Sequence, residues 1–421
     1  MKNLILSLTL ISTAALAHPV DGNRPIPDDE MTIRFMEGQT EETSLERIQA
    51  LNLNSATTAL DLWSGSYWPH YQGSLAVRYR EAHFISLMQK KAQWKDFKEA
   101  FEKQPLYVFA GSEEALSPAE KYDLVAGDND MTLTKYSWEV GKKTASSSGT
   151  VPTWRGVCDG WSSASQKMPR PVKAVTLKTP EGRPVVFYPE DIKALGSLSY
   201  ARSQSSPAFL GKRCVSPLLA LFTNACDGTN PGALHRALVN RVGKLHKSFI
   251  ADVSPGSEVW NYPVKNYKFT FYNPFDMEVT YTDFKTAMEP FGNKKHFRAS
   301  DKRHKNTSFI VGVKAEVAYA DMREANLSAT DSQEADKVLN KVYYYDLELD
   351  SRFNILGGEW ATNDQPDFIW APMDSAYPLS DEEEKGVVPM TPADIAKMAK
   401  AASKVGQPLS VIIQQLFELA K

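Results

Sequence analysis

Residues 154–165 read WRGVCDGWSSAS and place one cysteine, Cys158, among small and polar residues. The run Ser162–Ser165 can begin a helix, and a cysteine near a helix N-terminus has its thiolate favoured by the helix dipole and the free N–H groups. Gly156 and Gly160 would let a substrate backbone approach the sulfur closely. An inert structural cysteine is expected in an apolar run, which this is not. The segment therefore predicts a reactive thiol with a lowered pKa.

A thiol nucleophile needs a base, and that base needs a group that orients it. His235 follows a turn and enters an apolar run, and Asp252 lies inside the apolar run 249–253. An ionised carboxylate in such a run is costly unless it has a partner. If the two segments pack as neighbours, the imidazole meets the carboxylate. We predict Cys158 as nucleophile, His235 as base and Asp252 as orienting acid. Asn261 is the alternative third member, and a structural acid capping the next turn is the alternative for Asp252.

The first 17 residues have the pattern of a secretory signal peptide. Lys2 supplies a positive start, an apolar run extends from Leu4 to Leu16, and Ala15–Leu16–Ala17 matches a cleavage site. The alternative, a membrane anchor, needs about 20 apolar residues, which are not present in this run. We expect cleavage near Ala17 and a secreted or periplasmic protein in an oxidising compartment.

The three cysteines are informative in that compartment. Cys214 and Cys226 flank a short apolar segment, and a bridge between them closes the shortest loop of the three possible pairs. We predict this pair as a disulfide, although counting alone also allows either residue to pair with Cys158. The preferred pairing leaves Cys158 as a free thiol.

The composition excludes several classes of protein. The 421 residues carry 48 basic and 51 acidic side chains, and this net charge of −3 argues against a broad nucleic-acid surface. Zinc ribbons need CxxC pairs, and the sequence has none. Beyond the signal peptide we expect no integral membrane segment, and no feature specifies an oligomeric state.

The pattern along the chain changes from helical to strand-like near a polar hinge at residues 143–151. We predict an α+β protein with a signal peptide (1–17), a helical N-terminal region (18–145), a catalytic domain (146–379) and a C-terminal helical extension (380–421). The predicted strands are Val172–Leu177, Val185–Tyr188, Val239–Val242, Ser248–Val253, Tyr267–Tyr272, Met277–Thr282, Ser308–Ala318 and Val342–Leu349.

Several motifs, in a shared order, resemble the transglutaminase-elicitor family of secreted oomycete cell-wall transglutaminases and their bacterial relatives. The principal ones are Val157–Trp161, Gly232–His235 and Glu258–Val264. Further matches are Trp63–Gly65 with Tyr67–Pro69, and Gly357–Trp360 ahead of Pro366–Phe368. The resemblance covers roughly residues 60–372.

The resemblance implies a papain-like α+β core with a Cys–His–Asp triad, here Cys158, His235 and Asp252. The implied activity is that of a protein-glutamine γ-glutamyltransferase, which forms a cysteine thioester from a Gln carboxamide and passes the acyl group to a Lys or a small primary amine. Its partners would be proteins with accessible Gln and Lys. Trp154, Trp161 and Trp260 could wall an amine channel, with core aromatics as the alternative for each.

The same resemblance bears on metals and on competing functions. The proposed chemistry requires no cofactor, but calcium is possible because calcium dependence occurs among transglutaminases. The acidic stretch Gly127–Asp130 lacks EF-hand spacing and predicts no site by itself. Two other functions remain open at this point. One is a cysteine protease or amidase on the same triad, and the other is a secreted binding protein that keeps the fold without catalysis.

Overall fold

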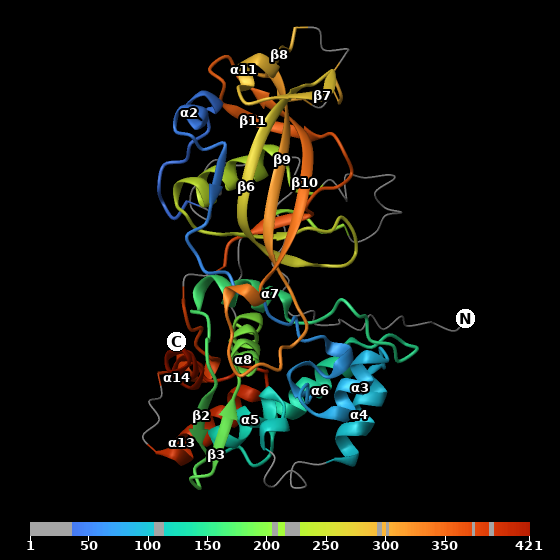
Figure 1. Cartoon of the computed structure of the whole chain (residues 1–421), viewed down its shortest axis with the longest axis vertical. Coiled ribbons are helices and arrows are strands. Elements are labelled where there is room, and N and C mark those ends of the chain that lie inside the picture. Colours follow the sequence, from blue (N-terminus) through green and yellow to red (C-terminus); the bar gives the residue numbers. More distant parts are fainter. Residues whose placement is uncertain are drawn as a thin grey trace, which may run out of the picture.

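The computed structural model describes residues 36–104, 113–203, 209–214, 228–292, 297–299, 303–372, 375–386 and 391–421. These residues form two halves stacked along the long axis of the molecule (Figure 1), one built around a long sheet and the other mainly of helices. Helix α7 (Cys158–Lys167) lies where the halves meet. The combination of helices with an antiparallel sheet confirms the predicted α+β class.

Ten of the described strands form one sheet, in which the order β11-β10-β9-β6-β5-β12-β4 runs from one edge to the other. Alternation along β6 shows why the sheet forms, because Tyr267, Phe269 and Phe271 are buried while Lys268 between them is exposed. The strands are β1 (Ser55–Thr57), β4 (Phe209–Gly211), β5 (Ile250–Asp252), β6 (Asn261–Asn273), β7 (Asp276–Tyr281), β8 (Glu289–Pro290), β9 (Phe309–Asp321), β10 (Lys337–Leu349), β11 (Ile355–Trp360) and β12 (Phe368–Trp370).

One face of this sheet is covered by helix α10 (Pro231–Ala237) and the π-helix η5 (Leu238–Lys244) that continues it. Their apolar side chains join the buried strand residues in one hydrophobic cluster. The predicted strand Val239–Val242 is therefore wrong. All four of its residues are buried, the polar Asn240 and Arg241 included, so polarity in this run does not distinguish an exposed face from a buried one.

The other half consists of helices around α7 and α8, with a small hairpin beside them. Helices α5 and α13 follow the N-caps Ser117 and Thr391, each with a proline as the first helical residue, and each has a capping box. The helices here are α3 (Ala82–Gln89), α4 (Trp94–Lys103), α5 (Pro118–Ala126), α6 (Thr132–Thr144), α7, α8 (Pro189–Ala201), α13 (Pro392–Ser403) and α14 (Ser410–Ala420), and the hairpin is β2 (Val175–Lys178) with β3 (Pro184–Phe187). Among the described residues, the remaining short helices are α2 (Leu45–Ala50), α11 (Phe284–Ala287), α12 (Asp381–Glu384), η1 (His70–Gln72), η2 (Ser74–Ala76), η4 (Glu113–Ala115) and η7 (Gln333–Ala335).

The two halves do not follow the predicted boundaries at residues 145 and 379. Strand β1 pairs with β6, so part of the predicted N-terminal helical region belongs to the sheet half. Helices α7 and α8, from the predicted catalytic domain, lie in the helical half, where α14 packs against α8. The chain crosses between the halves several times, whereas the polar hinge at residues 143–151 connects α6 to α7 within the helical half.

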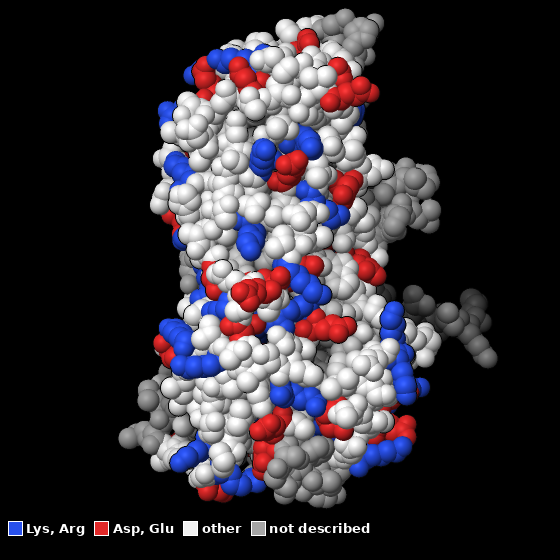
Figure 2. Space-filling model, viewed as in Figure 1, with Lys and Arg blue, Asp and Glu red and all other residues white. Residues whose placement is uncertain are grey.

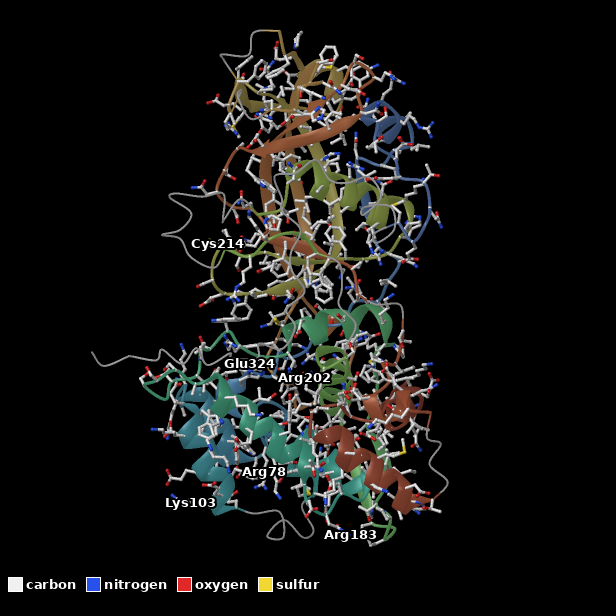
Figure 3. All side chains as sticks on the ribbon, turned by 180° about the vertical axis from the view of Figure 1, so that it is seen from behind. Arg78, Lys103, Arg183, Arg202, Cys214 and Glu324 are labelled. Carbon is white, nitrogen blue, oxygen red and sulfur yellow. The ribbon has the colours of Figure 1, made fainter. Side chains whose placement is uncertain are left out.

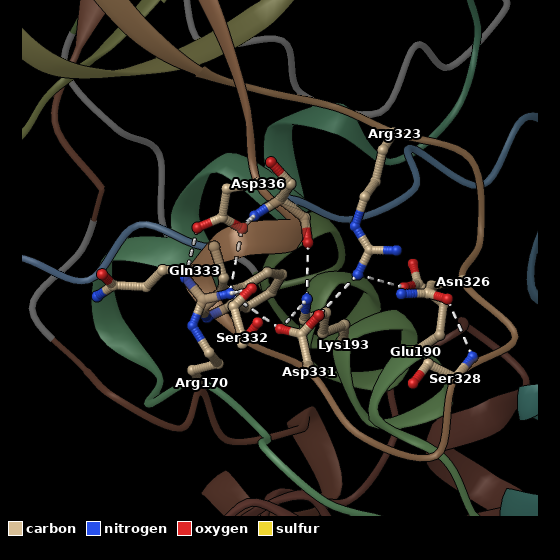
Figure 4. Close-up of polar contacts among 12 residues, drawn as sticks. Arg170, Glu190, Lys193, Arg323, Asn326, Ser328, Asp331, Ser332, Gln333 and Asp336 are labelled. Carbon is tan, nitrogen blue, oxygen red and sulfur yellow. Dashed lines mark hydrogen bonds and ion pairs between the residues drawn. The ribbon is translucent and has the colours of Figure 1, made fainter.

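A buried cluster of charges fastens the halves together where the loop between β9 and β10 reaches the helical half (Figure 4). Asp331 accepts from Arg170 at 2.9 Å, from Lys193 of α8 at 2.7 Å and from Arg323 at 2.9 Å. Arg170 also pairs with Asp336 at 2.6 Å. Because charges out of water must find partners at fixed positions, this cluster specifies how the loop docks.

Several predictions fall outside the described residues. The signal peptide (1–17) and Cys226 are among them, so the disulfide with Cys214 stays a prediction.

Figure 3 places Cys214 in the sheet half and Arg202 in the helical half. Among the described residues no helix is long and apolar enough to cross a membrane. On the face shown in Figure 2, acidic and basic side chains are interspersed, in keeping with the near-neutral charge balance.

Candidate active site

Cys158 is the first residue of α7, and the chain reaches it through close backbone packing. The Val157 N–H donates to the Tyr67 carbonyl at 2.7 Å. A Cβ added to Gly156 would lie 2.3 Å from that same oxygen, and one added to Gly160 would lie 1.9 Å from the Ser197 carbonyl oxygen of α8. The space beside both glycines is thus filled by the protein's own backbone. The prediction that they admit a substrate backbone is wrong.

The Cys158 thiol is free and buried, with 6% of the residue exposed. Its sulfur receives the Asn261 side-chain N–H at 3.6 Å and can donate its own hydrogen to the Val259 carbonyl at 3.7 Å. Burial, followed by the nearby Asp159 carboxylate, raises the pKa of the thiol to about 12. The predicted lowering of this pKa is therefore wrong, because loss of solvation outweighs the helix N-terminus. The resting thiol is neutral and must lose its proton as it reacts.

Asp252 lies close enough to this thiol for its charge to affect the thiol pKa. It is directly opposite Asn261 in the β5–β6 pairing, so the two side chains share one face of the sheet. Oδ1 of Asp252 accepts the Trp260 N–H at 2.8 Å and the Ser254 N–H at 3.4 Å, while Oδ2 is buried without a partner. Burial raises the pKa of the carboxyl to about 7. Its charge also raises the pKa of Cys158, so the two groups interact electrostatically.

His235 does not join these residues. Its Nδ1 forms a hydrogen bond with the Tyr345 hydroxyl at 2.9 Å, and its ring stacks on Phe269 with centroids 4.1 Å apart. Phe269 is eight residues along β6 from Asn261, which is about 25 Å at the rise of a strand. Burial alone lowers the pKa of His235 to about 3. The expected meeting of His235 with Cys158 and Asp252 is therefore wrong. This histidine lies in the core beneath the sheet.

The described part of the chain supplies no other histidine to the thiol. The hydrogen bonds of Cys158 there run to Asn261 and Val259 only. His70 is buried, with both ring nitrogens unpartnered, and burial followed by the charges of Arg202 and Arg155 lowers its pKa to about 3. Asp252, whose charge affects the thiol, instead has a pKa near neutrality.

The three predicted channel tryptophans have different surroundings. Trp161 is fully buried and donates its indole N–H to the Trp63 carbonyl at 3.2 Å, so it is a core residue and its assignment to a channel is wrong. Trp260 is half-buried and meets Tyr67 edge to face at 5.4 Å. Trp154 is half-buried too, and the guanidinium groups of Arg155 and Arg213 lie 5.0 and 5.2 Å from its ring. Only the last two can line an approach to the thiol.

Strand β12 contributes two site residues that sequence reasoning missed. The Trp370 indole N–H donates to Asn261 Oδ1 at 2.9 Å. Asp367 is buried just before the strand, and its charge contributes to the raised pKa of Asp252, whereas burial raises the pKa of Asp367 itself to about 6. The short apolar run 368–370 after an acid resembles the run 249–253 and could have indicated a second strand at the site.

No group of three or more potential metal ligands occurs among the described His, Cys, Asp and Glu side chains. In the stretch Gly127–Asp130, the Asp128 carboxylate accepts the N–H groups of Asp130 and Thr132, and Asp130 pairs with Lys400. These acids therefore have structural partners of their own.

A thiol at a helix start, facing an antiparallel sheet that presents a carboxyl and an amide to it, is an arrangement suited to acyl transfer through a thioester. The chain belongs to the Transglutaminase elicitor family, which matches residues 36–381. Among solved structures it is similar to the GP42 transglutaminase from Phytophthora sojae, at 22% sequence identity, with 90% of this chain and 98% of that chain covered and a TM-score of 0.54. That likeness shows a shared fold. No curated protein sequence matches the chain.

Proposed function

We propose that this chain is a secreted protein-glutamine γ-glutamyltransferase whose acyl-enzyme forms on Cys158. The observation that carries the proposal is the free, buried thiol with the Asn261 amide 3.6 Å away and the Asp252 carboxyl opposite that amide. Family membership supports the same reaction class. The substrates would be protein Gln side chains together with Lys side chains or small primary amines.

In the proposed reaction Asp252 takes the role that sequence analysis gave to His235. A base poised near neutral pH is suited to accept and return a proton, and the Asp252 carboxyl has a pKa of about 7 and an unpartnered oxygen. The thiol gives its proton to this oxygen as sulfur attacks the Gln carboxamide carbon. The same proton passes to the leaving nitrogen, so that ammonia departs and a thioester remains.

The second half of the reaction reverses these roles. A primary amine attacks the thioester carbon, and Asp252 accepts a proton from the amine nitrogen. Asp252 passes this proton to the sulfur as the C–S bond breaks, which regenerates the thiol. The product is an isopeptide bond. The Asn261 N–H stabilises the negative charge on sulfur in both halves, because a hydrogen bond to the charged form favours it. Side chains carry every step, and calcium dependence can be tested separately by chelation.

The proposal is tested with mature protein, a glutamine-containing casein and a labelled primary amine. The parent should incorporate label, and Cys158→Ser and Asp252→Asn should lose at least about 100-fold in rate, as expected for removal of a nucleophile or a base. His235→Gln is the matched control, because it changes a buried titratable residue remote from the thiol. Casein fragments without incorporated label would instead indicate a protease. Biological activity unaffected by Cys158→Ser would indicate a binding protein.

A further inference from the structure

We propose that Trp370 is a positioning residue that fixes the Asn261 amide with its N–H toward the Cys158 sulfur. The inference deepens the proposed function, because it names a residue that prepares the thiol for attack. Trp370 and Asn261 are both buried, at 6% and 4% exposed.

The argument begins with the chemistry of the indole. A tryptophan N–H can only donate, whereas an asparagine amide ends in one acceptor and one donor of nearly equal size. The Trp370 N–H lies 2.9 Å from one end of the Asn261 amide, which must therefore be the oxygen. The nitrogen is then left at the other end, 3.6 Å from the sulfur of Cys158. The indole thereby selects one of two otherwise similar orientations.

The orientation matters because of the other group at the sulfur. The Val259 carbonyl, 3.7 Å from the sulfur, can only accept and so favours the neutral thiol. With the Asn261 N–H toward it, the sulfur also has a donor that favours the thiolate. If the amide were reversed, two oxygens would face the sulfur and would oppose its ionisation. One hydrogen bond from Trp370 thus decides whether the Asn261 side chain favours or opposes ionisation of the thiol, while the Asn261 backbone N–H favours ionisation in either orientation.

The backbone holds these two side chains in place. Asn261 of β6 is opposite Asp252, and Trp370 of β12 is opposite Ile250, so both strands pair with β5 from its two sides. Ile250 and Asp252 are two residues apart and lie on the same face of the sheet. The indole therefore reaches Asn261 diagonally across β5 from a strand that is itself hydrogen-bonded to β4.

The test follows alkylation of Cys158 by iodoacetamide across pH, read by mass spectrometry, in the full mature chain. Trp370→Phe keeps an aromatic ring and removes the donor. It should slow alkylation at about pH 8 by about three- to tenfold, the effect of losing one hydrogen bond, and shift the pH midpoint upward. Asn261→Ala should have a similar effect, and the double variant should be no slower than the slower single variant.

Trp360→Phe is the matched control, since its indole N–H also donates, to the Thr229 carbonyl at 2.8 Å, and it lies outside the site. This variant should alkylate at the parent rate. A folded Trp370→Phe variant that is alkylated at the parent rate would overturn the inference. So would a double variant whose loss of alkylation rate is the combined loss of the two single variants.

Asn261→Asp provides a test that does not depend on Trp370→Phe folding. The aspartate keeps an acceptor for the indole but turns an oxygen toward the sulfur, so it should alkylate more slowly than Asn261→Ala. An equal or faster rate would contradict the inference. Alkylation needs no glutamine substrate. Absence of amine incorporation by the parent would therefore refute the proposed function but would leave the alkylation test of Trp370 valid.

Discussion

Replacing Asp252 with asparagine should stabilise the fold at alkaline pH while removing activity. Burial raises the pKa of this carboxyl from 3.8 to about 7, so the folded state keeps a proton that the unfolded chain has released. The contribution of Asp252 to stability is therefore highest below pH 3.8 and falls as pH rises toward 7. At about 1.4 kcal/mol per pKa unit, the carboxyl destabilises the fold by about 2 kcal/mol at pH 5 and by about 4 kcal/mol at pH 8.

Asparagine does not ionise, and its oxygen can still accept the Trp260 N–H. Asp252→Asn should thus gain about 2–3 kcal/mol more over the parent at pH 8 than at pH 5. The free energy of unfolding is measured by urea titration with tryptophan fluorescence at both pH values. A gain of equal size at the two pH values would refute the reasoning.

Asp61→Asn is the control of opposite sign. A hydrogen bond from Arg170 lowers the pKa of Asp61, so this carboxylate stabilises the fold at every pH above 3.8 and loses that contribution only in acid. The variant should be less stable than the parent by the same amount at pH 5 and pH 8. A loss that grew with pH would show that the two carboxyls do not differ as described.

His235→Gln should keep label incorporation within about threefold of the parent, because the His235 ring contacts the core and not the thiol. A folded variant with a loss of about 100-fold or more would show that His235 takes part in catalysis. Lys193→Met should lower the free energy of unfolding by about 1–3 kcal/mol, since Asp331 loses one charged hydrogen-bond donor but keeps Arg170 and Arg323. An unchanged free energy of unfolding in urea titration would show that the cluster does not need Lys193. Gly160→Ala should cost about 1–3 kcal/mol by forcing α7 away from the facing α8 carbonyl, and thermal unfolding at the parent temperature would contradict that close approach.

The elements that the sequence predicted well are those with a periodic pattern and a strong start signal. Strand β6 extends the predicted run Tyr267–Tyr272 at both ends, and its buried and exposed residues alternate. Helix α13 begins at Pro392 as its Thr-Pro cap indicates. The π-helix at Val239–Val242 could not be recognised in this way, because its polar residues Asn240 and Arg241 are buried along with its valines and do not mark an exposed face.

The candidate site was predictable only in part, for a different reason. Cys158 and Asp252 each stand out locally, the first by its small neighbours and the second as an acid in an apolar run. His235 has the same local signature whether it faces a thiol or a core tyrosine, and tertiary packing on Phe269 decides between them. The thiol pKa likewise depends on how deeply the sheet buries it, which no short window of sequence contains.

The position of α7 between the two halves makes the site a shared product of both. The sulfur belongs to a helix of one half, and the amide and carboxyl beside it belong to strands of the other. A small hinge opening would leave each half intact yet draw the thiol away from the groups that ionise it. Under mild denaturation, then, enzymatic activity should be lost before secondary structure is lost. Docking of the two halves would be the step that completes the active site.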